Sequence, residues 1–355
     1  MIFTLGNLGS KLISFLLIPL YTNALTTTEY GVVDLIATVG TVAAPVLTLN
    51  ICESVMRFAL DKDANKDKIT QIGTNLLLIG IVVGLVIFPI CHSFNRISQY
   101  SVFVYFYVIS LAASQLYLCD LRGKELLVYY SIGNVLHTFF IAALNILFLV
   151  VFKGGIEGYL NAYIIANILT ATYALIMGKG YRSFSFSGVD KKLLQRMIRY
   201  SIVLIPNSFM WWIMNSSDRV MVSSMVGIAA NGIYAVSYKL PTLVSTLTTI
   251  FNQAWSYSAI REEGTEDENE YNNKIFRTLI GIVMLIGIGL ITFMKPFLSI
   301  YVAKEYYVAW KYTPFLTVGC VYLTLATFMA TSYTVHKDSF GYLFSGMFGA
   351  IFNIV

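Results

Sequence analysis

Apolar residues form long and nearly uninterrupted runs along the chain. Many of these runs reach about 20 residues, the length that an α-helix needs to cross the hydrocarbon core of a bilayer. A membrane strand would need only about ten residues in strict apolar and polar alternation, so helices are predicted. The predicted spans are residues 3–22, 31–56, 72–91, 101–119, 126–151, 156–177, 200–226, 230–256, 275–294 and 308–332, with part of an eleventh from 341 onward.

The composition is that of a polytopic membrane protein and excludes a water-soluble enzyme. Only 12% of the 355 residues are charged and 57% are apolar, whereas soluble domains carry about 25% charged residues. A mean hydropathy of +0.70 leaves too few polar side chains to cover a soluble core, so lipid must cover it. The cysteines lie in apolar segments without paired spacing, so we expect small buried hydrophobes and neither a disulfide framework nor a zinc site. They are Cys52, Cys91, Cys119 and Cys320.

The two ends of the chain predict a fragment of a longer transporter. Met1 leads into an apolar helix, and Lys11 within that helix argues against a cleavable signal peptide. Val355 stops inside an apolar run. We therefore expect the gene to continue with at least one further apolar span.

Lysine and arginine predict the orientation in the membrane. Sixteen of them fall in one set of alternate connections and five in the opposite set. Because cytoplasmic loops are enriched in Lys and Arg, the first set and the N-terminus are predicted to be cytoplasmic.

An internal repeat divides the chain. Residues 28–55, shifted by 201 positions, fall on residues 229–256, and Gly31 then falls on Gly232. The shift contains an even number of predicted spans, so the two copies have the same orientation and are related by an axis along the membrane normal. The predicted domains are an N-terminal lobe of six helices (1–177), a cytoplasmic basic linker (178–199) and an incomplete C-terminal lobe (200–355).

Polar residues inside the spans locate a predicted cleft, because polar groups in hydrocarbon must face protein or water. The second span has Asp34, Thr38, Thr41, Pro45, Thr48 and Cys52 on one helical face, and the shift carries this stripe onto Ala235, Lys239, Thr242, Thr246, Thr249 and Gln253. The seventh span has Asn207, Trp211, Asn215 and Arg219, with Asp218 adjacent, and the first has Asn7, Lys11 and Ser14. We expect spans one, two, seven and eight to line a central cleft.

These polar positions differ in how strongly they indicate a ligand. A single Ser or Thr in a membrane helix more often bonds its own backbone or a neighbouring helix. A lysine at mid-span, such as Lys11 or Lys239, is expected to face an aqueous cavity. Asp218 is the candidate counter-ion of Arg219, Lys311 an interfacial anchor, and His137 a helix-packing residue rather than a proton relay.

Two stretches resemble a known family. They are GNLGSKLISFLLIPLYTNALTTTEYGVVDL and IPNSFMWWIMNSSDRVMVSSMVGIAANGIYAVSYKLPTL, and they are similar to Wzx-type oligosaccharide flippases of the multidrug/oligosaccharidyl-lipid/polysaccharide exporter superfamily. The resemblance implies an all-α polytopic membrane protein with two six-helix lobes in a V around a central cationic cleft, a MATE-like fold. It also implies alternating-access transport of undecaprenyl-pyrophosphate-linked repeat units across the bacterial cytoplasmic membrane, for O-antigen, capsule or exopolysaccharide.

The residues favour an anionic substrate within that superfamily. A drug extruder would be expected to have a carboxylate at membrane depth in the first span, where this sequence has Lys11. Lysines neutralise a pyrophosphate, and amide, hydroxyl and aromatic groups bind sugars. The candidate substrate contacts are Lys11, Lys239, Arg219, Arg57, Asn7, Asn207, Asn215, Trp211, Thr242 and Gln253, with Asp34, Asp218 and Glu53 as weaker candidates for coupling to H+ or Na+.

The sequence has no phosphate-binding glycine loop, paired catalytic carboxylates or metal-ligand cluster, so no enzymatic activity, cofactor, metal or nucleic-acid partner is expected. Membrane lipid, a polysaccharide polymerase and other assembly proteins are the further candidate partners. Two alternatives stay open. One is a cation-coupled multidrug exporter of the same superfamily, and the other is a membrane-embedded glycosyltransferase or polymerase, which the short outer connections disfavour.

Overall fold

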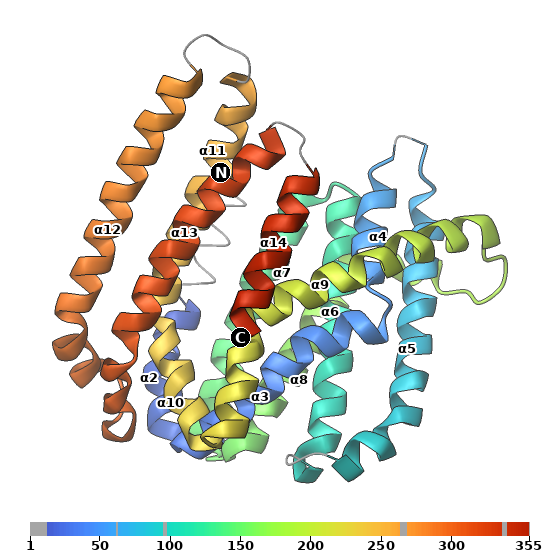
Figure 1. The fold of residues 1–355 in the computed structure, drawn as a ribbon. Helices are drawn as coiled ribbons and strands as arrows, with labels where there is room; N and C mark the ends of the chain where they lie inside the picture. The colour runs from blue at the N-terminus through green and yellow to red at the C-terminus, as the bar shows by residue number, and fades with distance from the viewer. Residues whose placement is uncertain (1–12, 62, 95–97, 263–267, 336–338, 355) are drawn as a thin grey trace. The chain divides into compact units, whose positions relative to one another are not determined.

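A computed structural model describes residues 13–61, 63–94, 98–262, 268–335 and 339–354, and every regular element within them is helical (Figure 1). Seven of the described helices are long and apolar enough to cross a membrane. The chain is therefore a multi-pass membrane protein. These spans are Thr27–Leu47, Lys66–Ile87, Ser98–Gly123, Leu127–Val151, Gly155–Met177, Glu270–Tyr301 and Thr313–Tyr333.

The helices form two compact units, which are described separately. The first contains Met1–Leu25 and Val32–Val220, and the second contains Thr26–Gly31 and Met221–Val355. The boundary lies inside α9 (Lys191–Met225), so most of α9 packs in the first unit. The predicted six-helix lobes and linker end at other residues, and that division stays a prediction.

In the first unit, α6 (Ser101–Gly123) packs against four other helices, and its Leu116 and Leu121 are almost completely buried. A long helix in lipid gains little from hydrophobicity alone, so close packing and interhelical hydrogen bonds hold the bundle together. The helices around α6 are α4 (Ile51–Ala59), α5 (Lys66–Phe94), α7 (Leu127–Asn145) and α8 (Gly155–Met177), and α2 (Ile18–Ala24) and α3 (Thr27–Leu47) precede them.

A buried polar network connects α6, α7 and α8. His137 Nε2 lies 3.0 Å from Asn167 Oδ1, and Ser114 donates to the same oxygen at 3.3 Å. Asn167 Nδ2 in turn donates to Ser110 Oγ at 3.4 Å. The expectation that His137 is a helix-packing residue is confirmed, because its ring is used in bonding between helices.

The predicted second span is not one helix, so the prediction of a continuous polar stripe from Asp34 to Cys52 was wrong. α3 ends at Leu47 and α4 begins at Ile51. Leu49 and Asn50 between them have left-handed backbones, with φ of 51° and 54°. Pro45 removes one backbone donor near this end of α3, and Asn tolerates the left-handed region better than most residues, so the helix breaks here. Cys52 therefore does not share a helical face with Asp34.

Cys52 and Cys119 are paired as a disulfide that connects α4 to α6, with Cα atoms 5.8 Å apart. The prediction that no cysteines would pair was wrong. Their sequence separation of 67 residues carries no recognisable spacing, and only the packing of α4 on α6 brings them together. Cys320 is buried and forms no disulfide, as expected, and the side chain of Cys91 lies outside the described part of the chain.

In the second unit, the predicted eighth span is also divided. α10 (Ile228–Lys239) ends one residue before Leu240, and α11 begins at Pro241 and continues to Glu262. Proline lacks an amide hydrogen and crowds the preceding turn, which explains the interruption. The remaining helices are α12 (Glu268–Tyr301), α13 (Thr313–Val335) and α14 (Ser339–Ile354).

A short 3-10 segment, η4 (Lys304–Lys311), connects α12 to α13. Lys311 is its last residue and is exposed, so it lies before α13 and not one turn inside a span as predicted. The predicted span, which starts at residue 308, began too early because Val308, Ala309 and Trp310 of this segment are apolar.

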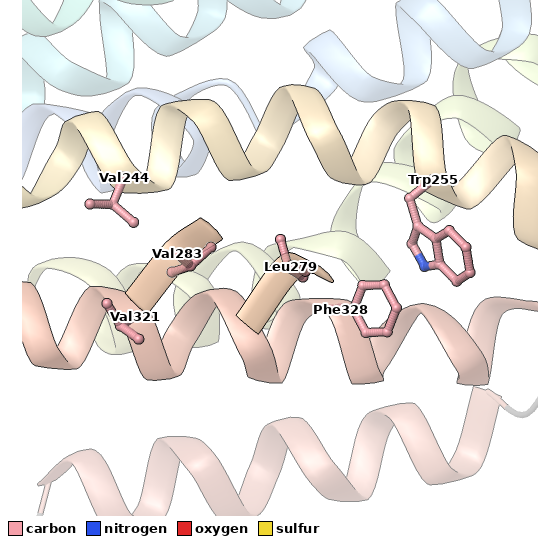
Figure 2. Packing of buried hydrophobic residues seen from close by; sticks show 6 residues of the cluster. All are labelled: Val244, Trp255, Leu279, Val283, Val321 and Phe328. Atoms are coloured by element: carbon pink, nitrogen blue, oxygen red, sulfur yellow. The ribbon is translucent and has the colours of Figure 1, made fainter. Parts of the chain in front are cut away.

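The core of the second unit is an apolar cluster between α11, α12 and α13 (Figure 2). Trp255 and Phe328 stack with ring centroids 4.9 Å apart, and Phe276 and Phe328 stack with ring centroids 5.2 Å apart. The buried members are Val244, Trp255, Leu279, Val283, Val321 and Phe328.

Candidate functional site: a polar line along α3, α4 and α9

A buried ion pair joins α3 to α9 within the first unit. Arg219 Nη1 lies 2.7 Å from Asp34 Oδ1, and the two side chains are 18% and 7% exposed. Asp218, the predicted counter-ion, instead accepts a hydrogen bond from the backbone N–H of Arg219 at 3.0 Å. The guanidinium is therefore neutralised across the helix interface by a residue 185 positions away.

The ion pair is one end of a series of polar contacts that we call the polar line. Trp212 Nε1 donates to the carbonyl oxygen of Thr38 at 3.0 Å. Asn50, at the break between α3 and α4, donates to Ser208 Oγ at 3.4 Å. The positions rise along α3 and fall along α9, so the two segments run antiparallel.

At the other end of the polar line, two fully buried serines meet on α4 and α9. Ser201 donates to Ser54 Oγ at 2.8 Å, and Ser54 donates to the carbonyl oxygen of Met197 at 2.6 Å. The polar line therefore follows both halves of the broken second span.

The α9 residues of the polar line share one face that the sequence analysis missed. Positions 201, 208, 212 and 219 project within about 40° of each other on a helix of 100° per residue. The predicted set of 207, 211, 215 and 219 drifts over about 120° by the same arithmetic. A search at seven- and four-residue spacing would have found the observed face.

Asp34 and Arg219 are costly to bury and costly to separate. Removing either partner leaves an uncompensated buried charge, which destabilises proteins by about 3–5 kcal/mol. Because α3 is one of the spans that can cross a membrane, an intramembrane ion pair of this kind is by default a candidate functional site.

The internal repeat is visible in the second unit as a close backbone crossing at the two equivalent glycines, Gly31 and Gly232. A Cβ added to Gly31 would lie 2.0 Å from the carbonyl oxygen of Ile228, and one added to Gly232 would lie 2.0 Å from that of Thr27. Thr27 and Ile228 are themselves related by the 201-residue shift. The two repeats thus meet through one contact made twice, at a distance that only glycine permits.

Threonines at two repeat-equivalent positions donate to backbone carbonyls three residues earlier in the chain. Thr41 donates to the carbonyl oxygen of Thr38 at 2.7 Å, and Thr242 donates to that of Lys239 at 2.6 Å. This confirms the expectation that most such hydroxyls satisfy local backbone. Thr242 therefore offers a ligand only the acceptor side of its hydroxyl.

The other described site residues are half-buried or exposed. Lys239 is the last residue of α10 and is half-buried. Arg57 forms an exposed ion pair with Asp61, 2.7 Å apart and each 56% exposed. Glu53 and Asn215 are also exposed.

Five predicted residues cannot be located in the same way. Lys11 and Asn7 lie outside the described residues, and the side chains of Asn207, Trp211 and Gln253 are not described. The predicted convergence of Lys11 and Lys239 therefore stays a prediction. Among the described residues, no three His, Cys, Asp or Glu side chains form a group that could hold a metal ion.

The fold is similar to the folds of solved transporters of the MOP superfamily. A MATE-family multidrug resistance transporter of that superfamily, in an inward-facing conformation, is similar with a TM-score of 0.66 at 15% identity, over 99% of this chain and 83% of the other. A MATE protein in complex with MaD3S has a TM-score of 0.61 at 14% identity, over 98% and 83%. A MOP-superfamily transporter from Pyrococcus furiosus has a TM-score of 0.52 at 14% identity, over 99% and 92%.

A sequence model of the polysaccharide biosynthesis protein family matches residues 1–257, and the chain belongs to that family. No curated protein matches it. The similarity to the solved structures confirms the predicted all-helical MATE-like fold, and the family match confirms the superfamily that the two sequence stretches indicated.

Proposed function

We propose that this protein is a flippase that moves undecaprenyl-pyrophosphate-linked oligosaccharides across the bacterial cytoplasmic membrane by alternating access, for surface polysaccharide synthesis. Membership of the polysaccharide biosynthesis family supports the pathway. The observation that supports an anionic substrate is the guanidinium of Arg219, which lies at an interhelical position on α9 in a bundle of membrane-spanning helices.

Arg219 suits a pyrophosphate for a geometric reason. A guanidinium presents paired N–H donors that match phosphate oxygens, and it stays charged when buried. Two unit charges 4 Å apart interact by about 4 kcal/mol at an effective dielectric of 20, before desolvation is subtracted. In the described state Arg219 is paired with Asp34. We propose that the pyrophosphate competes with Asp34 for the guanidinium when α3 and α9 separate along the polar line.

Charge is a reasonable discriminator within this superfamily. The Pyrococcus furiosus transporter is described as having a binding pocket of reverse polarity that suggests a different function. For this chain we propose that Lys11 and Lys239 contribute further positive charge to the substrate path, with Asn7, Asn207, Asn215, Trp211, Thr242 and Gln253 contacting the sugars.

The test is flipping of an undecaprenyl-pyrophosphate-linked oligosaccharide in proteoliposomes. The double variant Lys11→Ala, Lys239→Ala should lose most of the activity at normal reconstitution, and the double Arg variant should keep part of it because the charge is retained. Lys311→Ala is the control, because Lys311 is exposed on η4. Full flipping by the double Ala variant would contradict the electrostatic account.

A cation-coupled multidrug exporter is the second candidate, and the similarity to MATE structures favours it. The same proteoliposomes distinguish the two functions. Efflux of an organic cation, without flipping of the lipid-linked sugar, would support the exporter. An exporter would also be expected to depend on carboxylates such as Asp34 more than on Lys11 or Lys239.

A further inference from the structure

The segment between α8 and α9 is held on α5 through hydrogen bonds to the backbone of the segment. Gln71 Nε2 donates to the carbonyl oxygens of Ser185 and Ser187, at 2.8 and 3.0 Å. Asn75 Nδ2 donates to the carbonyl oxygen of Ser185 at 3.1 Å. The backbone of this segment is therefore held against the bundle by hydrogen bonds from two side chains of one helix.

The docked segment nevertheless presents its aromatic side chains outward. Phe184 is 50% exposed, Phe186 is 75% exposed, and Tyr181 earlier in the segment is 49% exposed. In the sequence Ser-Phe-Ser-Phe-Ser, serine carbonyl oxygens accept the hydrogen bonds from α5, and the phenylalanine rings between them stay uncovered. Fixed apolar rings outside a protein core indicate contact with another apolar phase or a partner.

The first turns of α9, which begins five residues after Phe186, carry a basic face. Asp190 Oδ1 accepts from the backbone N–H groups of Leu193 and Lys192, both at 3.1 Å, and these bonds lower the pKa of Asp190. This cap fixes the start of the helix. Met197 is fully buried. The exposed face contains Lys191, Lys192, Arg196 and Arg199, within an arc of about 140°.

Depth along α5 indicates what covers this surface. Gln71 and Asn75 lie in the first turns of the membrane-spanning stretch Lys66–Ile87, so the docked segment lies at the end of a span, where the bilayer interface begins. Aromatic rings and basic side chains together are the composition of interfacial anchors. Basic clusters at this depth attract anionic head groups.

We propose that Tyr181, Phe184, Phe186 and the basic face of α9 form a binding surface for the anionic lipids of the adjacent leaflet. The rings insert at head-group level, and the lysines and arginines pair with phosphate groups. The surface holds the first turns of α9, the helix that carries Ser201, Ser208 and Arg219 of the polar line, at a set depth. This inference does not depend on the transported substrate.

Lipid contact is tested by tryptophan fluorescence of the variant Phe186→Trp in nanodiscs. The emission spectrum of the parent chain is subtracted to remove the signal of the native tryptophans. The added tryptophan should emit at shorter wavelength than in water and should be quenched by lipids with brominated chains. Asp63→Trp, at an exposed position between α4 and α5, is the matched control and should be quenched several-fold less. Equal quenching of both positions, or a water-like emission from residue 186, would overturn the insertion of the ring.

The preference for anionic lipid is tested by native mass spectrometry after purification from mixed phosphatidylglycerol and phosphatidylcholine nanodiscs. The double variant Lys191→Gln, Lys192→Gln should lower the retained phosphatidylglycerol at least two-fold. The control Lys153→Gln, Lys304→Gln removes two exposed lysines from other connections and should retain as much phosphatidylglycerol as the parent chain. Unchanged retention of phosphatidylglycerol by the first variant would overturn the pairing of the basic face with lipid phosphates. Co-purification of a protein that protects residue 186 from quenching would show that a protein, and not lipid, covers this surface.

Discussion

The contact of α3 and α4 with α9 differs in kind from the contact among α11, α12 and α13. The first is a polar line with an ion pair, an indole hydrogen bond and paired serines. The second is an apolar cluster of stacked rings and branched side chains (Figure 2). Thr248 and Thr324 add one hydroxyl contact at 3.0 Å to that cluster.

This difference shows what the internal repeat retained and what it did not. The shift that superimposes Gly31 on Gly232 carries Asp34 onto Ala235, which is fully buried. The close backbone crossing needs glycine in both copies, whereas only the first copy has the carboxylate. The repeat therefore specifies the backbone, and the buried charge of α3 is particular to one copy.

The largest expected effect comes from breaking the ion pair. Arg219→Gln or Asp34→Asn should lower the free energy of unfolding by about 3–5 kcal/mol, because the remaining charge loses its buried partner. The double variant should recover part of that loss, since it leaves no charge behind. Thermal unfolding in detergent measures all three. Additive losses in the double variant would show that the two residues do not act as a pair.

The glycine crossing should be nearly as sensitive. Gly31→Ala or Gly232→Ala should cost about 1–3 kcal/mol or more, because a methyl group would overlap a backbone carbonyl that cannot rotate away. The matched control is Gly281→Ala on α12, where no atom lies within 4 Å of the added carbon. If Gly31→Ala unfolded at the same temperature as Gly281→Ala, the close approach would be wrong.

The apolar cluster should tolerate change better. Phe328→Leu keeps an apolar side chain but loses stacking on Trp255 and Phe276, each worth about 0.5–1.5 kcal/mol. We expect lower thermal stability with the same substrate selectivity in proteoliposomes. A change in selectivity would place the cluster at the substrate path and remove the functional contrast between the two regions.

The smallest effect is expected at the exposed ion pair of Arg57 and Asp61. Arg57→Gln should leave the free energy of unfolding almost unchanged, because more than half of each side chain in this pair is exposed to solvent. Measured beside Arg219→Gln, it compares the same substitution in an exposed and a buried pair. A flipping defect in Arg57→Gln at normal stability would restore Arg57 to the substrate contacts predicted from sequence.

Local properties of the sequence determined the class of fold. Runs of apolar residues predict membrane helices wherever they occur, because hydrocarbon obliges each span to satisfy its own backbone. The 201-residue repeat and the two family-like stretches could likewise be recognised without coordinates, and the crossing of Gly31 with Gly232 agrees with the repeat. Within described residues, even His137 was assigned correctly from its setting in an apolar helix.

Only the tertiary structure decided which polar groups meet. Asp218 adjoins Arg219 in sequence, yet α9 turns the guanidinium toward Asp34 on α3, and the packing of α4 on α6 pairs Cys52 with Cys119. Hydropathy records how much each residue avoids water and carries no information on the rotation or register of one helix against another. Those depend on breaks such as Thr48–Asn50 and Leu240, and on close packing between helices distant in sequence.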